Sequence, residues 1–149
     1  MTIELAPLRE VTDLSQLVQW IDMDTAGQQW LPVYTKPTAV FQMWHKPGHE
    51  FFLARKEGHL IGFAHVEHLG NADASFSYYV QPDHRGRGFG GELIATLRTH
   101  LAKQGITRVL ALVDSHNEAS KRSLVRAGFT VESTNTSAFV IVYTSLAKG

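Results

Sequence analysis

The sequence predicts an α/β fold of the α+β type, with a mixed, mostly antiparallel central sheet, one parallel strand–helix–strand crossover, and helices on both faces. Three observations support this class. Hydrophobic residues recur with helical spacing in two early segments, which predicts amphipathic helices. The runs that follow alternate apolar and polar residues, and turn segments separate them. A continuous apolar run at 107–113 lies between two helical patterns, which is typical of a strand covered on both faces.

The N-terminal half is predicted to contain two helices and an antiparallel meander. Thr12 is a suitable N-cap for the first helix, and the second helix begins near Pro37. The segment 27–36 between them contains a proline and is predicted to be a loop. Turns at Glu57-Gly58 and Gly70-Asn71 join the later strands. The predicted strands of this half are residues 2–9, 51–55, 60–69 and 74–80.

The C-terminal half is predicted to form the crossover. Asn117 is a suitable N-cap for its second helix, and Gly128 a suitable end. The last strand offers an edge on which a homodimer could form. The predicted elements are a loop at 81–91, a helix at 92–103, a strand at 107–113, a helix at 117–127, and strands around residue 131 and at 138–144.

Composition excludes several classes of protein. The chain has 149 residues, 14 Lys and Arg against 14 Asp and Glu, and no cysteine. Thiol catalysis and thiolate metal sites are therefore excluded, and bulk electrostatic binding to nucleic acid is not expected. The eight histidines lack ligand spacing, so no metal is predicted. We expect one domain over residues 1–149 in the cytoplasm, because neither a signal peptide nor an apolar run long enough to span a membrane is visible.

The loop at 81–91 is the segment most indicative of function. It contains four glycines, Arg85 and Arg87, and it leads directly into an amphipathic helix. Glycine-rich backbone and a helix N-terminus together present several N–H donors to an anion, most naturally a pyrophosphate. The spacing Gly86-x-Gly88-x-x-Gly91 also fits a dinucleotide-binding loop, so an oxidoreductase remains an alternative. ATP is a poorer candidate, because the triplet Gly-Lys-Ser/Thr is absent.

Two motifs carry a resemblance to a known family. Arg85-x-x-Gly88-x-Gly90 follows a strand end, and Asn117-Glu118-Ala119-Ser120 is followed by Ala127-Gly128-Phe129. Over about residues 75–129 this pattern resembles the GNAT superfamily of acetyl-CoA-dependent N-acetyltransferases. The resemblance implies direct transfer of an acetyl group to a primary amine of a small molecule or a peptide or protein N-terminus. It also implies that the acetyl-CoA contacts are Tyr78, Tyr79, Val80, Arg85, Gly86, Arg87, Gly88, Phe89, Gly90, Gly91, Asn117 and Ser120.

The groups that transfer protons are not at the usual positions of that family. Those positions correspond here to the apolar residues Ala74, Leu112 and Leu124. Acyl transfer to an amine needs a proton acceptor and a proton donor. The substitutes that the sequence offers are Glu67, Asp114 and Tyr78. The alternative is a non-catalytic acyl-CoA-binding or regulatory domain.

Aromatic residues of the N-terminal half are candidates for an acceptor pocket, because the family builds that pocket in this part of the chain. The sequence also allows the simpler interpretation that they pack helices against the sheet, which suits Trp20 and Trp44 better. The residues concerned are Trp20, Trp30, Tyr34 and Trp44.

Overall fold

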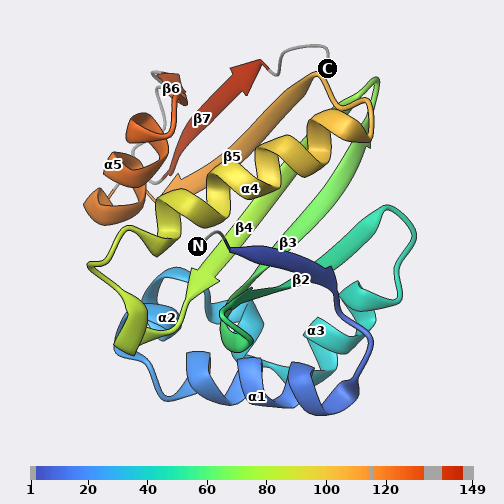
Figure 1. The fold of residues 1–149 in the computed structure, drawn as a ribbon, viewed down its shortest axis with the longest axis vertical. Helices are drawn as coiled ribbons and strands as arrows, with labels where there is room; N and C mark the ends of the chain where they lie inside the picture. The colour runs from blue at the N-terminus through green and yellow to red at the C-terminus, as the bar shows by residue number, and fades with distance from the viewer. Residues whose placement is uncertain (1–2, 115, 133–138, 146–149) are drawn as a thin grey trace.

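A computed structural model describes residues 3–114, 116–132 and 139–145, and it confirms the predicted fold class (Figure 1). The described strands form one sheet in the order β1-β2-β3-β4-β5-β7-β6. Neighbouring strands are antiparallel except β4 and β5, which are parallel. The strands are β1 (Glu4–Pro7), β2 (His49–Lys56), β3 (His59–Gly70), β4 (Asp73–Val80), β5 (Arg108–Asp114), β6 (Thr130–Glu132) and β7 (Phe139–Ser145).

The helices separate into two groups, which Figure 1 shows in the lower and upper halves of the view. α4 connects the parallel strands β4 and β5 and thus forms the predicted crossover. The helices are α1 (Val11–Asp22), α2 (Thr25–Trp30), α3 (Pro37–Trp44), α4 (Phe89–Lys103) and α5 (Glu118–Arg126), with short 3₁₀ helices η1 (Pro32–Thr35) and η2 (Pro82–His84).

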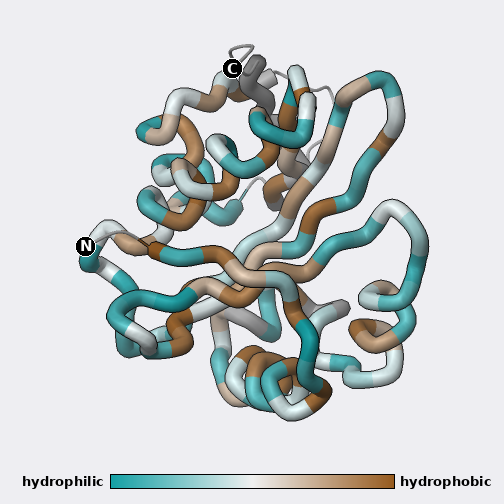
Figure 2. The backbone as a smooth tube through the Cα atoms, turned by 45° about the vertical axis from the view of Figure 1, so that its right-hand side comes forward, coloured by the Kyte–Doolittle hydropathy of each residue, from teal (hydrophilic) through white to brown (hydrophobic). Residues whose placement is uncertain are grey.

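Each face of the sheet buries its own core, because successive side chains of a strand point to opposite faces. Phe63 of β3 packs with α1 and α3, whereas its neighbour Ala64 packs with α4 and α5. Likewise, Tyr79 of β4 packs in the core with α1 and α3, and Val80 packs in the core with α4. In Figure 2 the central strands carry stretches of apolar residues, and the peripheral loops are mostly hydrophilic. The helices therefore cover both faces, as predicted.

The strands β4 and β5 separate partway along their length. Their ladder runs only from Asp73–Arg108 to Ser75–Leu110. Beyond Ser75, β4 continues to pair with β3 on its other side, up to Val80. β5 likewise continues to pair with β7, up to Asp114. The sheet thus opens between two strands that are each held from the far side, and this opening positions the candidate site.

Close approach of β3 and β4 at the mouth of this opening depends on Gly62. A Cβ atom at this position would lie 1.9 Å from the carbonyl oxygen of Tyr79. Such a contact is far below van der Waals distance, so only glycine permits this register of the two strands. The N-terminal end of β3 therefore fixes where β4 ends and the glycine-rich loop begins.

Two local predictions in the N-terminal half are wrong. Residues 27–36 are not a loop, because α2 extends to Trp30 and η1 follows it. Asp24, which we did not single out, starts α2: its Oδ1 accepts a hydrogen bond from the amide of Ala26 at 3.2 Å. The first helix begins at Val11, with Glu10 and not Thr12 at its N-cap position. A six-residue helix is too short to show a clear hydrophobic period, which explains why α2 was missed.

The last strand does not offer the predicted edge. β7 lies between β5 and β6 and pairs with both. The edges of the described sheet are β1 and β6, which have four and three residues. Short edge strands are poor templates for pairing with another chain. β7 is thus paired on both sides at residues 141–143, and a homodimer stays a prediction that this strand edge no longer supports.

Candidate active site

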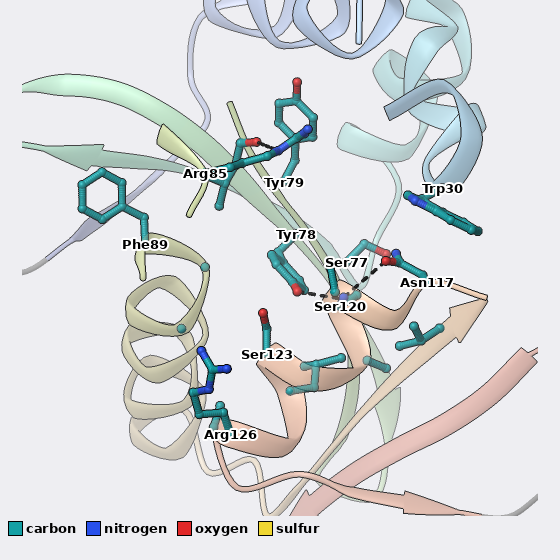
Figure 3. A pocket seen from close by; sticks show the side chains of 18 of the residues that line it. Trp30, Ser77, Tyr78, Tyr79, Arg85, Phe89, Asn117, Ser120, Ser123 and Arg126 are labelled. Atoms are coloured by element: carbon teal, nitrogen blue, oxygen red, sulfur yellow. Dashed lines mark hydrogen bonds between the residues drawn. The ribbon is translucent and has the colours of Figure 1, made fainter. Parts of the chain in front are cut away.

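A cavity of about 740 Å³ lies where β4 and β5 separate. Its wall is formed by β4 and β5, by the glycine-rich loop and the start of α4, by α5, and by the end of α2 (Figure 3). The polar and aromatic side chains of the wall are Trp30, Phe76, Ser77, Tyr78, Tyr79, Arg85, Phe89, Asn117, Ser120, Ser123 and Arg126. Most of the sequence-predicted cofactor contacts therefore lie around one cavity, although they come from three separate segments.

The glycine-rich loop presents backbone donors to this cavity. Gly86 and Gly88 have positive φ angles of 77° and 81°, and Gly88 occupies the N-cap position of α4. The first amide hydrogen bond within α4 joins Glu92 to the carbonyl of Gly88. The amides of Phe89, Gly90 and Gly91 precede that bond, so they have no carbonyl partner within the helix. These donors and the helix dipole favour an anion at this end of the cavity.

The side chain of Arg85 is already engaged within the protein. Its Nε donates to the carbonyl of Val80 at 2.9 Å, and its NH2 group lies 2.5 Å from Oδ2 of Asp24. Its backbone amide donates to the carbonyl of Pro82 at 3.2 Å. Arg85 therefore joins the end of β4 to the start of α2, and much of its charge is balanced by Asp24. Arg87 makes no ion pair among the described residues, but it is exposed and, unlike Arg85, is not among the residues of the cavity wall.

Asp24 is ionised in this arrangement. Burial opposes its ionisation, but hydrogen bonds from Arg85 and from the hydroxyl of Tyr79 outweigh that effect and hold the pKa of Asp24 below its usual value. Burial of Tyr79, together with the neighbouring Asp24 carboxylate, raises the pKa of Tyr79. The Arg85 guanidinium also lies 5.3 Å from the centre of the Tyr79 ring. These three side chains link the loop, β4 and α2 around the rim of the cavity.

Tyr78 points toward α5 from the opposite side of β4 (Figure 3). Its hydroxyl lies 3.1 Å from Oγ of Ser120. Burial raises the pKa of Tyr78, and hydrogen bonds with Ser120 and Ser123 partly oppose that rise. The hydroxyl therefore keeps its proton at neutral pH. Ser123, which the sequence analysis did not single out, lines the cavity beside Ser120.

Asn117 is the N-cap of α5, as predicted. Its Oδ1 accepts a hydrogen bond from the amide of Ser120 at 3.2 Å. An amide side chain has two N–H donors in addition to its acceptor oxygen. With the oxygen committed to the helix, these donors are left for a ligand in the cavity that Asn117 lines.

The other proposed proton-transfer groups are not in the described cavity wall. Glu67 lies on β3, where its Oε1 is 3.8 Å from Nε2 of His49 and its side chain is 49% exposed. Asp114 is the last residue of β5, but its side chain lies outside the described part of the structure, as does that of Leu112. Leu124 is fully buried and lines the cavity. The wall, as far as the structure describes it, contains no carboxylate and no imidazole.

Neither a metal nor a membrane-spanning segment is indicated by the part of the chain that the structure describes. It holds no group of three or more metal-binding side chains that could share an ion. Its helices are all too short or too polar to cross a bilayer.

Comparison with known proteins identifies the family. The model of the Acetyltransferase (GNAT) family matches residues 15–129. The chain therefore belongs to the GNAT acetyltransferase family, as the two motifs indicated. Mycothiol acetyltransferase of Streptomyces coelicolor is 34% identical over 97 residues, which are 62% of this chain and 30% of the relative. The corresponding enzyme of Thermobispora bispora is 34% identical over 94 residues, 58% and 32% of the two chains. The matched region thus spans about a third of these relatives.

Solved structures share the fold at low sequence identity. A ribosomal L7/L12 alpha-N-protein acetyltransferase in complex with coenzyme A superimposes with a TM-score of 0.81 and 17% identity, covering 100% of this chain and 97% of that one. AAC(6')-Ib in complex with ribostamycin and coenzyme A gives a TM-score of 0.82 at 15% identity, with 97% and 94% coverage. These similarities establish the GNAT fold and extend it over nearly the whole chain.

Proposed function

We propose that this chain transfers an acetyl group from acetyl-CoA directly to a primary amine of a small molecule or a peptide N-terminus. The observation that carries the proposal is the opening between β4 and β5 beside the N-terminus of α4. A cofactor with a pyrophosphate and a long polar arm fits this combination, since the helix end binds anions and the unpaired side of β4 offers hydrogen bonds to an extended arm. Acetyl-CoA has both parts.

Each part of the cavity has a role in this proposal. The amides from Gly86 to Gly91 bind the pyrophosphate, and Arg87 adds charge. The backbone of β4 at 78–80 pairs with the pantetheine arm, and one N–H donor polarises the thioester carbonyl. Asn117 donates to the arm near the sulfur. Tyr78, which stays protonated, donates a hydrogen bond to the sulfur as negative charge develops there.

The acceptor amine enters from the side of α2. Trp30 and Leu31 line the cavity there, and Figure 3 shows the Trp30 side chain on the side of α2. The amine nitrogen attacks the thioester carbon without a covalent enzyme intermediate, since orientation of two bound substrates supplies much of such a rate. A structural neighbour supports an amine acceptor: it is a Vibrio cholerae spermidine N-acetyltransferase in complex with CoA and spermine, with a TM-score of 0.81 and 17% identity.

Release of the CoA thiol tests the proposal. The chain is incubated with acetyl-CoA and separate alkylamines, amino sugars and peptides with free N-termini, and thiol release is measured beside acetyl-CoA binding. We expect turnover with at least one class of amine. Binding without turnover on any amine would contradict the proposal.

The second candidate function is an acyl-CoA-binding domain without turnover. It is favoured by the described cavity wall, which lacks a carboxylate and an imidazole. Binding of acetyl-CoA with no thiol release would support it. The dinucleotide-binding oxidoreductase that the glycine spacing allowed is set aside, because the chain belongs to the GNAT acetyltransferase family.

A further inference from the structure

His65 is a polar side chain in an apolar core. It is the one fully buried polar or charged residue that the structure describes. It lies on β3 and faces the layer of α1 and η1, away from α4. Its ring stacks on that of Phe51, with 4.2 Å between centroids and 7° between planes. The imidazole is thus held in one orientation, and both of its nitrogens have hydrogen-bond partners.

A continuous series of polar side chains passes through this ring. The hydroxyl of Tyr34 lies 2.7 Å from Nδ1 of His65, and Nδ1 of His49 lies 2.8 Å from its Nε2. Nε2 of His49 is 3.8 Å from Oε1 of Glu67, which is half exposed. At the other end, Ser77 pairs with His65 across β3 and β4, and its side chain hydrogen-bonds to Tyr34. We call Ser77, Tyr34, His65, His49 and Glu67 the histidine relay.

The relay connects the cavity to the surface. Ser77 lines the cavity, and the Glu67 carboxylate lies where solvent reaches it. The described cavity wall itself contains no base, yet amide formation requires the attacking nitrogen to lose a proton. One route from the wall to a buried imidazole runs through Ser77 and Tyr34.

Hydrogen bonding defines the direction of the relay. A carboxylate only accepts, so we assign the N–H of His49 to Nε2, which faces Glu67 at 3.8 Å in an ion-pair contact rather than a hydrogen bond. Its Nδ1 then accepts from Nε2–H of His65, whose Nδ1 accepts from the hydroxyl of Tyr34. Every donor in the resting state points away from the cavity. Burial and the neighbouring His49 lower the pKa of His65 to about 4, so this ring is neutral at physiological pH.

Tyr34 keeps its proton at neutral pH. Burial raises its pKa to about 12, the Ser77 hydrogen bond opposes that rise, and the Glu67 charge adds to it. The titratable side chains in contact with the relay or acting on it are its own members: Tyr34 from η1, His49 from β2, and His65 and Glu67 from β3.

We propose that the histidine relay accepts the proton of the attacking amine, holds it on His49, and returns it to the departing thiolate; this inference rests on the proposed function. As the C–N bond forms, the amine proton passes to Ser77, and each member transfers its own proton outward. His49 becomes an imidazolium facing the Glu67 carboxylate. When the C–S bond breaks, the transfers reverse, Ser77 gives a proton to the sulfur, and all members recover their starting protons. No electron is exchanged with another reagent.

Tyr34→Phe is the variant that breaks the relay while it keeps the ring contacts of Tyr34 with Phe51 and Phe63. We expect kcat to fall about 100-fold with the KM for acetyl-CoA unchanged, since positioned proton transfer contributes 10²–10⁴-fold. The wild-type kcat should decrease in acid, because a relay that already carries a proton cannot accept another. That acid limb should vanish in Tyr34→Phe, because this variant disconnects the relay from the cavity.

His68→Gln is the matched control. His68 is on the same strand but faces the other side of the sheet, where its Nε2 lies 2.7 Å from Oε1 of Glu50. The His68→Gln substitution should leave the kcat and the pH profile of the kcat unchanged. A purely structural role for Tyr34 would lower the kcat equally at every pH, and that result would overturn the relay.

Two further outcomes distinguish a failure of the relay from a failure of the proposed function. A wild-type chain that acetylates no amine overturns the proposed function, and the catalytic role of the relay falls with it. Nitrogen-15 NMR of the histidine side chains at pH 8 needs no turnover: we expect His65 to carry its proton on Nε2. If the enzyme is active but His65 carries its proton on Nδ1 at that pH, the relay is overturned.

Discussion

At the scale of single residues, Asn117 has two functions that can be separated. Its oxygen caps α5, and its amide donors remain for the cavity. Serine also caps helices but has no amide group. Asn117→Ser should therefore keep the free energy of unfolding within about 0.5 kcal/mol and raise the KM for acetyl-CoA about tenfold. Asn117→Ala should lose the cap as well, at about 1 kcal/mol. Urea unfolding and steady-state kinetics measure both; equal KM values for wild type and Asn117→Ser would contradict the ligand role.

His65 should make the stability of the protein depend on pH. Its pKa is about 4 in the folded chain against an ordinary value of 6.5, so the unfolded chain binds more protons between these values. The stability is complete above pH 6.5 and is lost as the pH falls toward 4, by up to about 3 kcal/mol. His65→Phe, which can still stack on Phe51, should be less stable at pH 8 but show a flatter profile.

Urea unfolding at pH 8, 6 and 5 measures the effect. The exposed His59 offers a control, because His59→Gln should retain the wild-type dependence on pH. Parallel pH profiles for wild type and His65→Phe would contradict the assigned cause.

Residue contacts show where sequence reasoning reaches its limit. Gly86, Gly88 and Asn117 were predicted because their conformations and caps depend on neighbours within a few positions. The bond between Arg85 and Asp24 joins residues 61 positions apart, and no local pattern marks it. The relay was equally out of reach: the sequence shows that Glu67 and His65 share a strand face, but not that Tyr34 packs against it.

At the scale of elements, the first turn of α4 is the part of the site that the sequence predicted best. Its glycines, its position after a strand and its amphipathic continuation are all local. The separation of β4 from β5 was not predicted, because it depends on β3 and β7 holding the two strands from outside. The sequence analysis missed α2 for a similar reason. Its six residues are stabilised by contacts with α1 and η1, which no pattern within the helix itself reveals.

A negative charge in that first turn should separate folding from ligand binding. Gly91 is the third residue of α4, and a Cβ there would meet no atom within 4 Å. Gly91→Asp should keep or slightly raise the free energy of unfolding, because acidic residues stabilise a helix N-terminus. It should also weaken acetyl-CoA binding at least tenfold, since the carboxylate occupies the place of the pyrophosphate.

Calorimetric titration and thermal unfolding measure the two effects. Thr99→Asp adds the same charge to an exposed position farther along α4 and should leave acetyl-CoA affinity unchanged. Undiminished binding by Gly91→Asp would contradict the assignment of the helix end to the pyrophosphate.

At the scale of the whole molecule, one sheet joins the two apolar cores. Successive residues along β3, and likewise along β4, belong to different cores. If these strands unfolded in one core, the other core would therefore be exposed as well. We propose on this basis that residues 1–149 act as one domain. Trp20, Trp30 and Trp44 lie in α1, α2 and α3, so tryptophan fluorescence reports one layer, while far-UV circular dichroism reports every helix and strand.

Acetyl-CoA should stabilise both layers together. Ligand at 100 times its dissociation constant adds about 2.7 kcal/mol to the free energy of unfolding. For a chain of this size that raises the Tm by roughly 5–10 °C. The fluorescence and dichroism transitions should coincide before and after addition, because the cavity wall contains residues of α2, β4 and α5 and binding couples the layers. NAD at the same concentration should shift neither. If the two transitions were separate, or if acetyl-CoA shifted the dichroism transition alone, the N-terminal helices would unfold independently of the rest. The α2 side of the cavity, where the acceptor amine is proposed to enter, would then not be stabilised by acetyl-CoA.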